Sequence, residues 1–120
     1  MDHKNLDVWK KSIDMVVDIY LLTNFFPKEE IYGITQQIRR SAVSVSSNIS
    51  EGCARKNDTE TIQFLYISLG SLAELETQLI ISQRIGYLRS SDEILKSLLE
   101  IKQMTLGLIN YLKSKNNNQK

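Results

Sequence analysis

The sequence predicts an all-α protein, an antiparallel four-helix bundle with up-down-up-down topology. Apolar residues recur at helical spacing along most of the chain. Helix breakers are scarce, with one proline, Pro27, and five glycines. The connections between the periodic segments are short, which favours antiparallel neighbours. The 120 residues have the size of one domain, and no linker or internal repeat divides them, so we expect a single bundle over residues 1–120.

The first helix is expected over about residues 7–23, with Asp7 as its N-cap. Helical spacing predicts an inner face made of Trp9, Ile13, Val16, Val17 and Tyr20. Pro27 then breaks the pattern. Because a proline followed by carboxylates is typical of a helix start, Pro27, Glu29 and Glu30 predict that a new helical segment begins here.

The second helix is expected over about residues 33–54. Its apolar residues recur three or four positions apart on one face: Ile34, Ile38, Ala42, Val45, Ile49 and Cys53. Five serines between positions 41 and 50 make this helix slim, so a neighbouring helix can approach it closely. Gly70, with Ser68 and Ser71 beside it, is expected to lie at that close approach.

The third helix is expected over about residues 58–85. It opens with Asn57 and Glu60 at the spacing of a capping box, and Gly86 follows it as a C-terminal cap. Two apolar series repeat every seven residues, as in left-handed bundles. They are Leu65, Leu72 and Leu79, and Tyr66, Ala73 and Ile80.

The fourth helix is expected from Ser90, which has capping-box spacing to Glu93, to about Lys113. One apolar row can face the bundle interior and consists of Ile94, Leu98, Ile101, Leu108 and Leu112. A second row is the candidate oligomer interface and consists of Leu95, Leu99, Leu106 and Ile109. The alternative, one wide stripe that fills a single bundle groove, stays open. Residues 114–120 are expected to form a disordered polar tail.

Composition excludes several functional classes. Fifteen basic and 14 acidic residues give a net charge of +1, which argues against a generally polybasic nucleic-acid binder. Cys53 is the only cysteine and His3 the only histidine, so we expect no disulfide framework, metal site or histidine-based catalysis. No glycine-rich phosphate loop occurs, and no cofactor or small-molecule substrate is expected. No signal peptide or bilayer-length apolar run is recognised, which predicts a cytoplasmic, non-enzymatic protein away from membranes.

The candidate contact residues for RNA or another partner form the densest basic set of the sequence: Arg39, Arg40, Arg55 and Lys56. Ordinary ion pairing, such as that of Glu51 with Arg55 at i,i+4, is the competing interpretation. Three further side chains are candidate buried polar groups: Glu76, Asn48 and Glu51. A buried Glu76 would need a partner such as Arg39 or Arg40. A hydrolase that uses Glu76 and Glu51 is the least favoured interpretation.

Several segments resemble the four-helix-bundle proteins encoded in intervening sequences of bacterial 23S ribosomal RNA genes. The resemblance is carried by the runs Phe26–Ser44, Asn48–Gly52 and Gly70–Leu79, with Leu6–Lys10 and Gly86–Leu88. It implies an antiparallel four-helix bundle that assembles as a homopentamer. The family is also similar to accessory proteins of diversity-generating retroelements, basic pentamers that bind nucleic acid and a reverse transcriptase.

Two functions follow as expectations. The first is an oligomeric helical bundle that binds RNA or a ribonucleoprotein through the basic residues of the second helix. The alternative is a scaffold or accessory subunit that binds another protein and has no nucleic-acid role. The small net charge and the second apolar row of the fourth helix favour the alternative.

Overall fold

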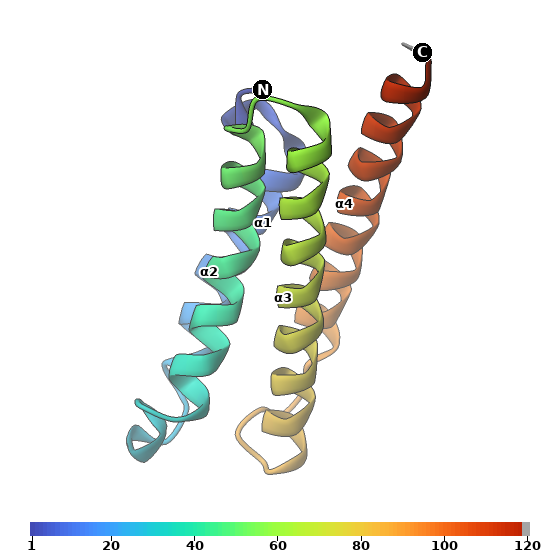
Figure 1. The fold of residues 1–120 in the computed structure, drawn as a ribbon. Helices are drawn as coiled ribbons and strands as arrows, with labels where there is room; N and C mark the ends of the chain where they lie inside the picture. Colours follow the sequence, from blue (N-terminus) through green and yellow to red (C-terminus); the bar gives the residue numbers. More distant parts are fainter. Residues whose placement is uncertain (119–120) are drawn as a thin grey trace.

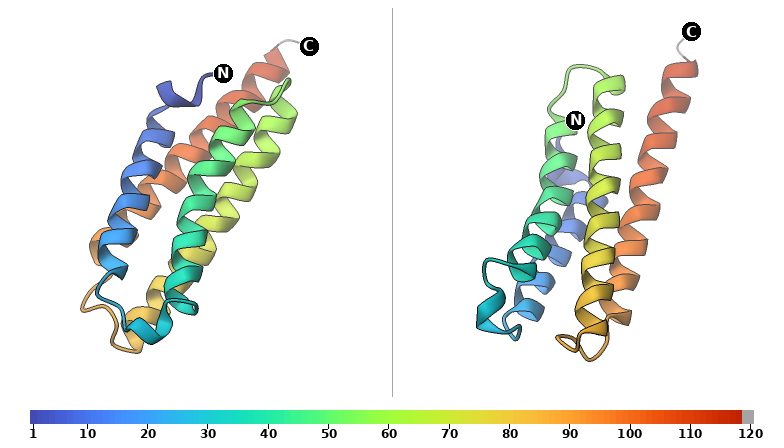
Figure 2. Two further views of the ribbon diagram at one scale, coloured as in Figure 1. Left: turned by 90° about the vertical axis from the view of Figure 1, so that its left-hand side faces the viewer. Right: turned by 60° about the horizontal axis from the view of Figure 1, so that its bottom comes forward.

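The computed structural model describes the backbone of residues 1–118 and the side chains of residues 1–115. Within this part, the four α-helices are α1 (Asp7–Thr23), α2 (Ile34–Cys53), α3 (Asp58–Arg84) and α4 (Asp92–Asn118), with the short 3₁₀ helices η1 (His3–Asn5) and η2 (Lys28–Glu30). Each α-helix packs against the next, and α4 closes the bundle against α1 (Figures 1 and 2). The predicted all-α bundle is confirmed, with dimensions of 54 × 22 × 20 Å.

Helix α1 occupies the predicted range, but its inner face was predicted only in part, since Trp9 and Val16 are half-buried against the core. Leu6 is the N-cap, and Asp7 is the first helical residue. The buried positions are Val8, Ser12, Met15, Ile19 and Thr23. Val17 and Tyr20 are exposed, so the helix is turned by about one residue from the expected orientation. Buried Ser12 and Thr23 donate hydrogen bonds to carbonyls of their own helix, which lets these polar side chains occupy the core.

The connection after α1 contains the predicted restart at Pro27, but only as the 3₁₀ turn η2. A regular helix begins at Ile34, after Gly33. The connection is tied to the α3–α4 loop, at the same end of the bundle, by Tyr87, whose hydroxyl donates to Glu30 Oε2 at 2.8 Å (Figure 1). This hydrogen bond, together with the negative charge of Glu30, raises the pKa of Tyr87.

Helices α2 and α3 form the most extensive pairing of the bundle. The predicted apolar face of α2 is confirmed from Ile38 to Cys53. Across the interface, Ser68 Oγ donates to the carbonyl oxygen of Val45 at 2.8 Å, and Ser44 and Ser71 share a hydrogen bond of 2.8 Å. Small hydroxyl side chains therefore join the two backbones closely, as the serines of α2 predicted.

The glycine at this close approach is Gly52, so the prediction for Gly70 is wrong. A Cβ at Gly52 would lie 3.0 Å from Phe64 Cβ and 3.1 Å from the carbonyl oxygen of Thr61. At Gly70 a Cβ would meet nothing within 4 Å, because that position faces outward.

Both ends of α3 are capped as predicted. Asn57 Oδ1 accepts from the backbone N–H of Glu60 at 2.9 Å. At the other end Gly86 has φ +91°, and the N–H groups of Gly86 and Tyr87 donate to the carbonyls of Gln83 and Ser82. This is the Schellman arrangement, which requires a left-handed residue after the helix. By length and composition α3 is apolar enough to cross a membrane, a test that core helices of bundles also meet.

Helix α4 begins at Asp92, and Ser90 Oγ accepts from the N–H of Asp92 at 3.2 Å. The helix continues to Asn118, beyond the predicted end near Lys113. Residues 119–120 of the predicted polar tail lie outside the described residues. At its C-terminal end α4 leans away from α3 (Figure 1). Two long side chains bridge this end, because Lys113 Nζ donates to Tyr66 Oη and Lys115 pairs with Asp58.

The core draws apolar side chains from all four helices, with Met15, Ile19, Ile38, Ile49, Leu65, Leu75, Leu79, Ile101, Ile109 and Leu112 essentially inaccessible. Among the described residues, every buried polar side chain is a serine or a threonine. Most of their hydroxyls donate to nearby carbonyls, which removes the cost of burying them.

Candidate functional site

The four candidate basic residues lie at opposite ends of α2. Arg39 and Arg40 are near its start, and Arg55 and Lys56 follow its C-terminal end. From Arg40 to its last residue, Cys53, the helix already spans about 20 Å. The structure therefore divides the candidate RNA contact into two sites within one protomer.

Arg39 is a structural clamp between α1 and α2. Its Nε donates to Thr23 Oγ1 at 2.9 Å, and its Nη2 donates to Asn24 Oδ1 at 3.1 Å. The guanidinium also lies 4.7 Å from the ring centre of Tyr20. A positive charge beside the last turn of α1 stabilises the helix dipole. Glu76, for which Arg39 was a predicted partner, is not part of this arrangement.

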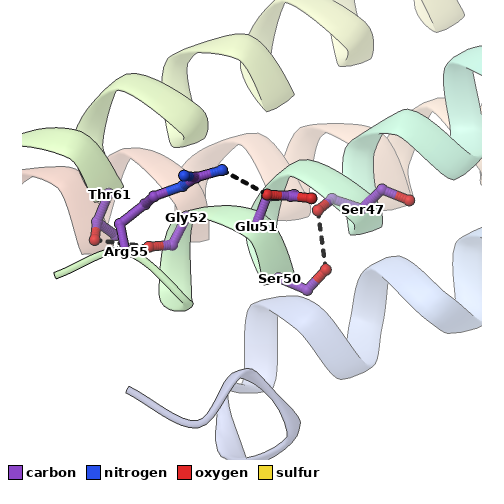
Figure 3. Close-up of polar contacts among 6 residues, drawn as sticks. All are labelled: Ser47, Ser50, Glu51, Gly52, Arg55 and Thr61. Carbon is purple, nitrogen blue, oxygen red and sulfur yellow. Dashed lines mark hydrogen bonds and ion pairs between the residues drawn. The ribbon is translucent and has the colours of Figure 1, made fainter.

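Arg55 is engaged in a similar way at the other end of α2. Its guanidinium lies 2.8 Å from Glu51 Oε2, the i,i+4 pair considered from the sequence (Figure 3). The same guanidinium lies 4.5 Å from the ring centre of Phe64. Beside it, Thr61 Oγ1 donates to the carbonyl oxygen of Gly52 at 2.8 Å. These contacts hold the α2–α3 turn, while Lys56 remains exposed within that turn.

Arg40 lies on an open groove of about 490 Å³. The groove is lined by Tyr20, Ile31, Gln36, Arg39, Arg40, Val43 and Ser44. Arg40 is exposed and makes no ion pair with any side chain that the structure describes. Of the two α2 arginines, Arg40 is thus the one whose charge is available to a partner.

Two of the three predicted buried polar groups are on the surface. Glu51 is exposed, as its pairing with Arg55 requires. Glu76 is also exposed. Leu69, seven residues before it on the same side of α3, is only half-buried, so this side of the helix lies at the edge of the core. Asn48 is half-buried, and its Nδ2 donates to the carbonyl oxygen and the hydroxyl of Ser44. The two glutamates do not meet in one pocket, so the geometry gives the hydrolase interpretation no support.

The predicted interface row of α4 is divided by the structure. Ile109 is 1% exposed and belongs to the core, so its assignment to the interface is wrong. Leu108, predicted to face the core, is only half-buried. Leu95 is half-buried, whereas Leu99 and Leu106 are exposed. The part of the predicted row before Ile109 is therefore available for contact with a partner.

An exposed apolar seam continues this row onto α3, which the sequence did not predict. Ala73 of α3 and Leu99 of α4 line the same small pocket of about 120 Å³, whose lining also includes Glu76 and Lys102. Seven-residue spacing places Tyr66, Ala73 and Ile80 in one row beside it, and all three are exposed. We call Tyr66, Ala73, Ile80, Leu95, Leu99 and Leu106 the α3–α4 seam. The seven-residue spacing of Tyr66, Ala73 and Ile80 was visible in the sequence. The sequence did not show that this series would be exposed while Leu65, Leu72 and Leu79 would be buried.

The described residues contain no group of three histidine, cysteine or carboxylate side chains that could hold a metal ion. The free thiol of Cys53 is buried, and this burial raises its pKa. Neither feature adds a reactive group to the surfaces described above.

Comparisons with known proteins identify the family. A solved structure, of a protein of unknown function from the S23 ribosomal protein family of Bacteroides thetaiotaomicron, is similar with a TM-score of 0.78 and 27% identity, covering 85% of this chain and 97% of that one. A comparison with curated proteins gives no match. The model of the 23S rRNA-intervening sequence protein family matches residues 4–107. Since this match covers most of the bundle, the chain belongs to the 23S rRNA-intervening sequence protein family.

Proposed function

We propose that the protein is a non-enzymatic, self-assembling helical bundle that contacts RNA or a ribonucleoprotein through Arg40. The exposed α3–α4 seam is the observation that carries the assembly. Exposed apolar side chains grouped on one face are typical of sites that bind another protein. A second copy is the occupant that we propose, because every copy carries the same seam, and the family resemblance implies a ring of five.

Assembly also raises the affinity for RNA, because it brings several copies of the Arg40 contact together. One protomer has a net charge of +1 and offers one unpaired arginine on the α1–α2 groove. A ring repeats Arg40 and the surrounding groove once per copy, so several weak phosphate contacts can act on one RNA. Tyr20 and Gln36 in the same groove supply a ring face and hydrogen-bonding groups beside the charge.

The RNA contact is tested by fluorescence anisotropy with a labelled 23S ribosomal RNA fragment, at about 50 and about 200 mM salt. Arg40→Ala is expected to weaken binding and to reduce the slope of log affinity against log salt by about one. Arg84→Ala is the matched control, since it removes another exposed arginine, from α3. Absence of binding at low salt would remove RNA from the proposal and leave the assembly intact.

The alternative function is a protein scaffold without a nucleic-acid role. Its specific support is that Arg39 and Arg55, two of the four candidate contacts, are engaged within the protomer. A pull-down from nuclease-treated extract distinguishes the two functions. A partner that survives digestion and does not respond to Arg40→Ala favours the scaffold.

A further inference from the structure

A cavity of about 350 Å³ lies between the end of α1 and the first turn of α2, under the connection that contains η2. Its apolar wall consists of Phe26, Pro27 and Ile31. Its polar wall consists of Thr23, Asn24, Lys28, Thr35 and Arg39. The lining surface is mostly apolar with a few polar groups, a composition typical of a ligand site.

Thr35 is the residue that distinguishes this cavity from a surface groove. Its side chain is 2% exposed, and its Oγ1 has no hydrogen-bond partner among the described residues. Other buried threonines, such as Thr23 and Thr105, donate to the carbonyl four residues earlier in their helix. Thr35 is the second residue of α2, so no helical carbonyl precedes it at that distance. A buried hydroxyl left unpaired is costly, and such groups usually have a partner.

The other polar groups around Thr35 are mainly hydrogen-bond donors. The guanidinium of Arg39 uses two of its five N–H groups on Thr23 and Asn24, which leaves three. The first turn of α2 has no side-chain cap, and its first backbone hydrogen bond runs from the N–H of Gln37 to the carbonyl of Gly33. The N–H groups of the first turn are therefore free, at the positive end of the helix dipole. Lys28 adds a positive charge at the rim.

Among the described residues, no carboxylate makes a hydrogen bond to these donors. Glu29 and Glu30 belong to the same connection but do not line the cavity. Glu30 lies next to it: its Oε2 accepts the hydrogen bond of Tyr87, and its Oε1 lies beside Gly33, the N-cap of α2.

We propose that this cavity binds the oxyanion group, phosphate or carboxylate, of a small molecule. The oxyanion accepts hydrogen bonds from the Thr35 hydroxyl, from Arg39 and from the first turn of α2, while a small apolar part contacts Phe26 and Ile31. The site lies in each protomer and needs neither RNA nor assembly. It therefore stands independently of the proposed function.

Inorganic phosphate and acetate are the two probes, added at millimolar concentrations with sodium chloride of equal ionic strength as the reference. Binding is followed by amide chemical shifts of Ile34, Thr35 and Gln36 and by the rise in Tm that a ligand of the folded state produces. Thr35→Val removes the hydroxyl at constant shape and is expected to weaken binding about tenfold or more. Thr35→Ser keeps a hydroxyl and is expected to retain binding.

Thr59→Val is the matched control, because Thr59 is likewise the second residue of its helix but is exposed and lines no cavity that the structure describes. The variants' Tm values without added oxyanion report folding separately. Binding of either probe that depends on Thr35 and not on Thr59 supports the site, and the probe that binds identifies the oxyanion. Equal responses of wild type and Thr35→Val, or no response beyond that to sodium chloride, would overturn it.

Discussion

Replacing Gly52 by alanine tests the close approach of α2 and α3. The new methyl group would lie 3.0 Å from Phe64 Cβ and 3.1 Å from the carbonyl oxygen of Thr61. Both atoms belong to the α3 framework, so neither can rotate away as a flexible side-chain tip could. The helices must separate by a few tenths of an ångström, which would also stretch the hydrogen bond from Thr61 to Gly52.

The magnitude follows from two opposing effects. Overpacking a methyl group in a tight interior costs about 1–3 kcal/mol. Alanine in place of glycine within a helix gains about 1 kcal/mol. Gly52→Ala is therefore expected to lower the free energy of unfolding by about 0–2 kcal/mol. Gly70→Ala makes no new contact and is expected to raise it by about 1 kcal/mol.

The difference between the two variants reports mainly the packing effect, because alanine also favours the helix at both positions, in the last turn of α2 and in the interior of α3. We expect Gly52→Ala to be less stable than Gly70→Ala by about 1–3 kcal/mol. Urea unfolding followed by circular dichroism at one protein concentration measures this difference. Equal stability of the two variants would refute the close approach at Gly52.

Three further predictions concern a helix cap, a thiol and an ion pair. Asn57→Ala removes the hydrogen bond to the N–H of Glu60 and is expected to cost about 1 kcal/mol in the same unfolding assay; an unchanged midpoint would contradict the cap. Cys53 is 3% exposed and its pKa is raised above 9.0, so at pH 8 the folded protein should react with a thiol reagent roughly tenfold or more slowly than the urea-unfolded chain. Glu100 accepts from Lys11, whose Nζ lies 2.5 Å away, and this contact lowers the pKa of Glu100. A lowered folded-state pKa contributes stability above the ordinary value of 4.5 that is lost as pH falls, so Glu100→Gln should reduce the acid-induced loss of Tm, and an unaltered pH profile would contradict the pair.

The helices and their caps could be predicted from the sequence because they depend on local signals. Asn57 and Gly86 act through groups within a few residues of themselves, and both predictions are confirmed. The orientation of α1 could not be predicted in the same way. Ser12 and Thr23 look polar in the sequence, yet each satisfies its hydroxyl on its own helix and enters the core. A prediction from apolar residues alone therefore assigned the core-facing side of α1 to the face next to the one that is buried.

The site depends on contacts between helices, which the sequence does not encode locally. Arg39 and Arg40 are equivalent as residue types, but only Arg39 lies opposite Thr23 and Asn24. Leu108 and Ile109 are adjacent apolar residues whose burial depends on how α4 is rotated against α3. Nothing in the sequence marks Thr35 as a binding residue, because a hydroxyl can be identified as buried and unpaired only from the structure around it.

Sedimentation equilibrium at low micromolar concentration tests most directly whether the α3–α4 seam is covered by other copies. We expect a mass several times 13.8 kDa for the wild type, and five times that value if the ring implied by the resemblance forms. Leu99 is 52% exposed in the protomer and would be buried by a second copy on the seam, so Leu99→Glu would bury a carboxylate there and should dissociate the assembly. Tyr111→Glu, about 120° around α4 from Leu99, should leave the mass unchanged. A wild-type mass of 13.8 kDa would contradict self-assembly through the α3–α4 seam.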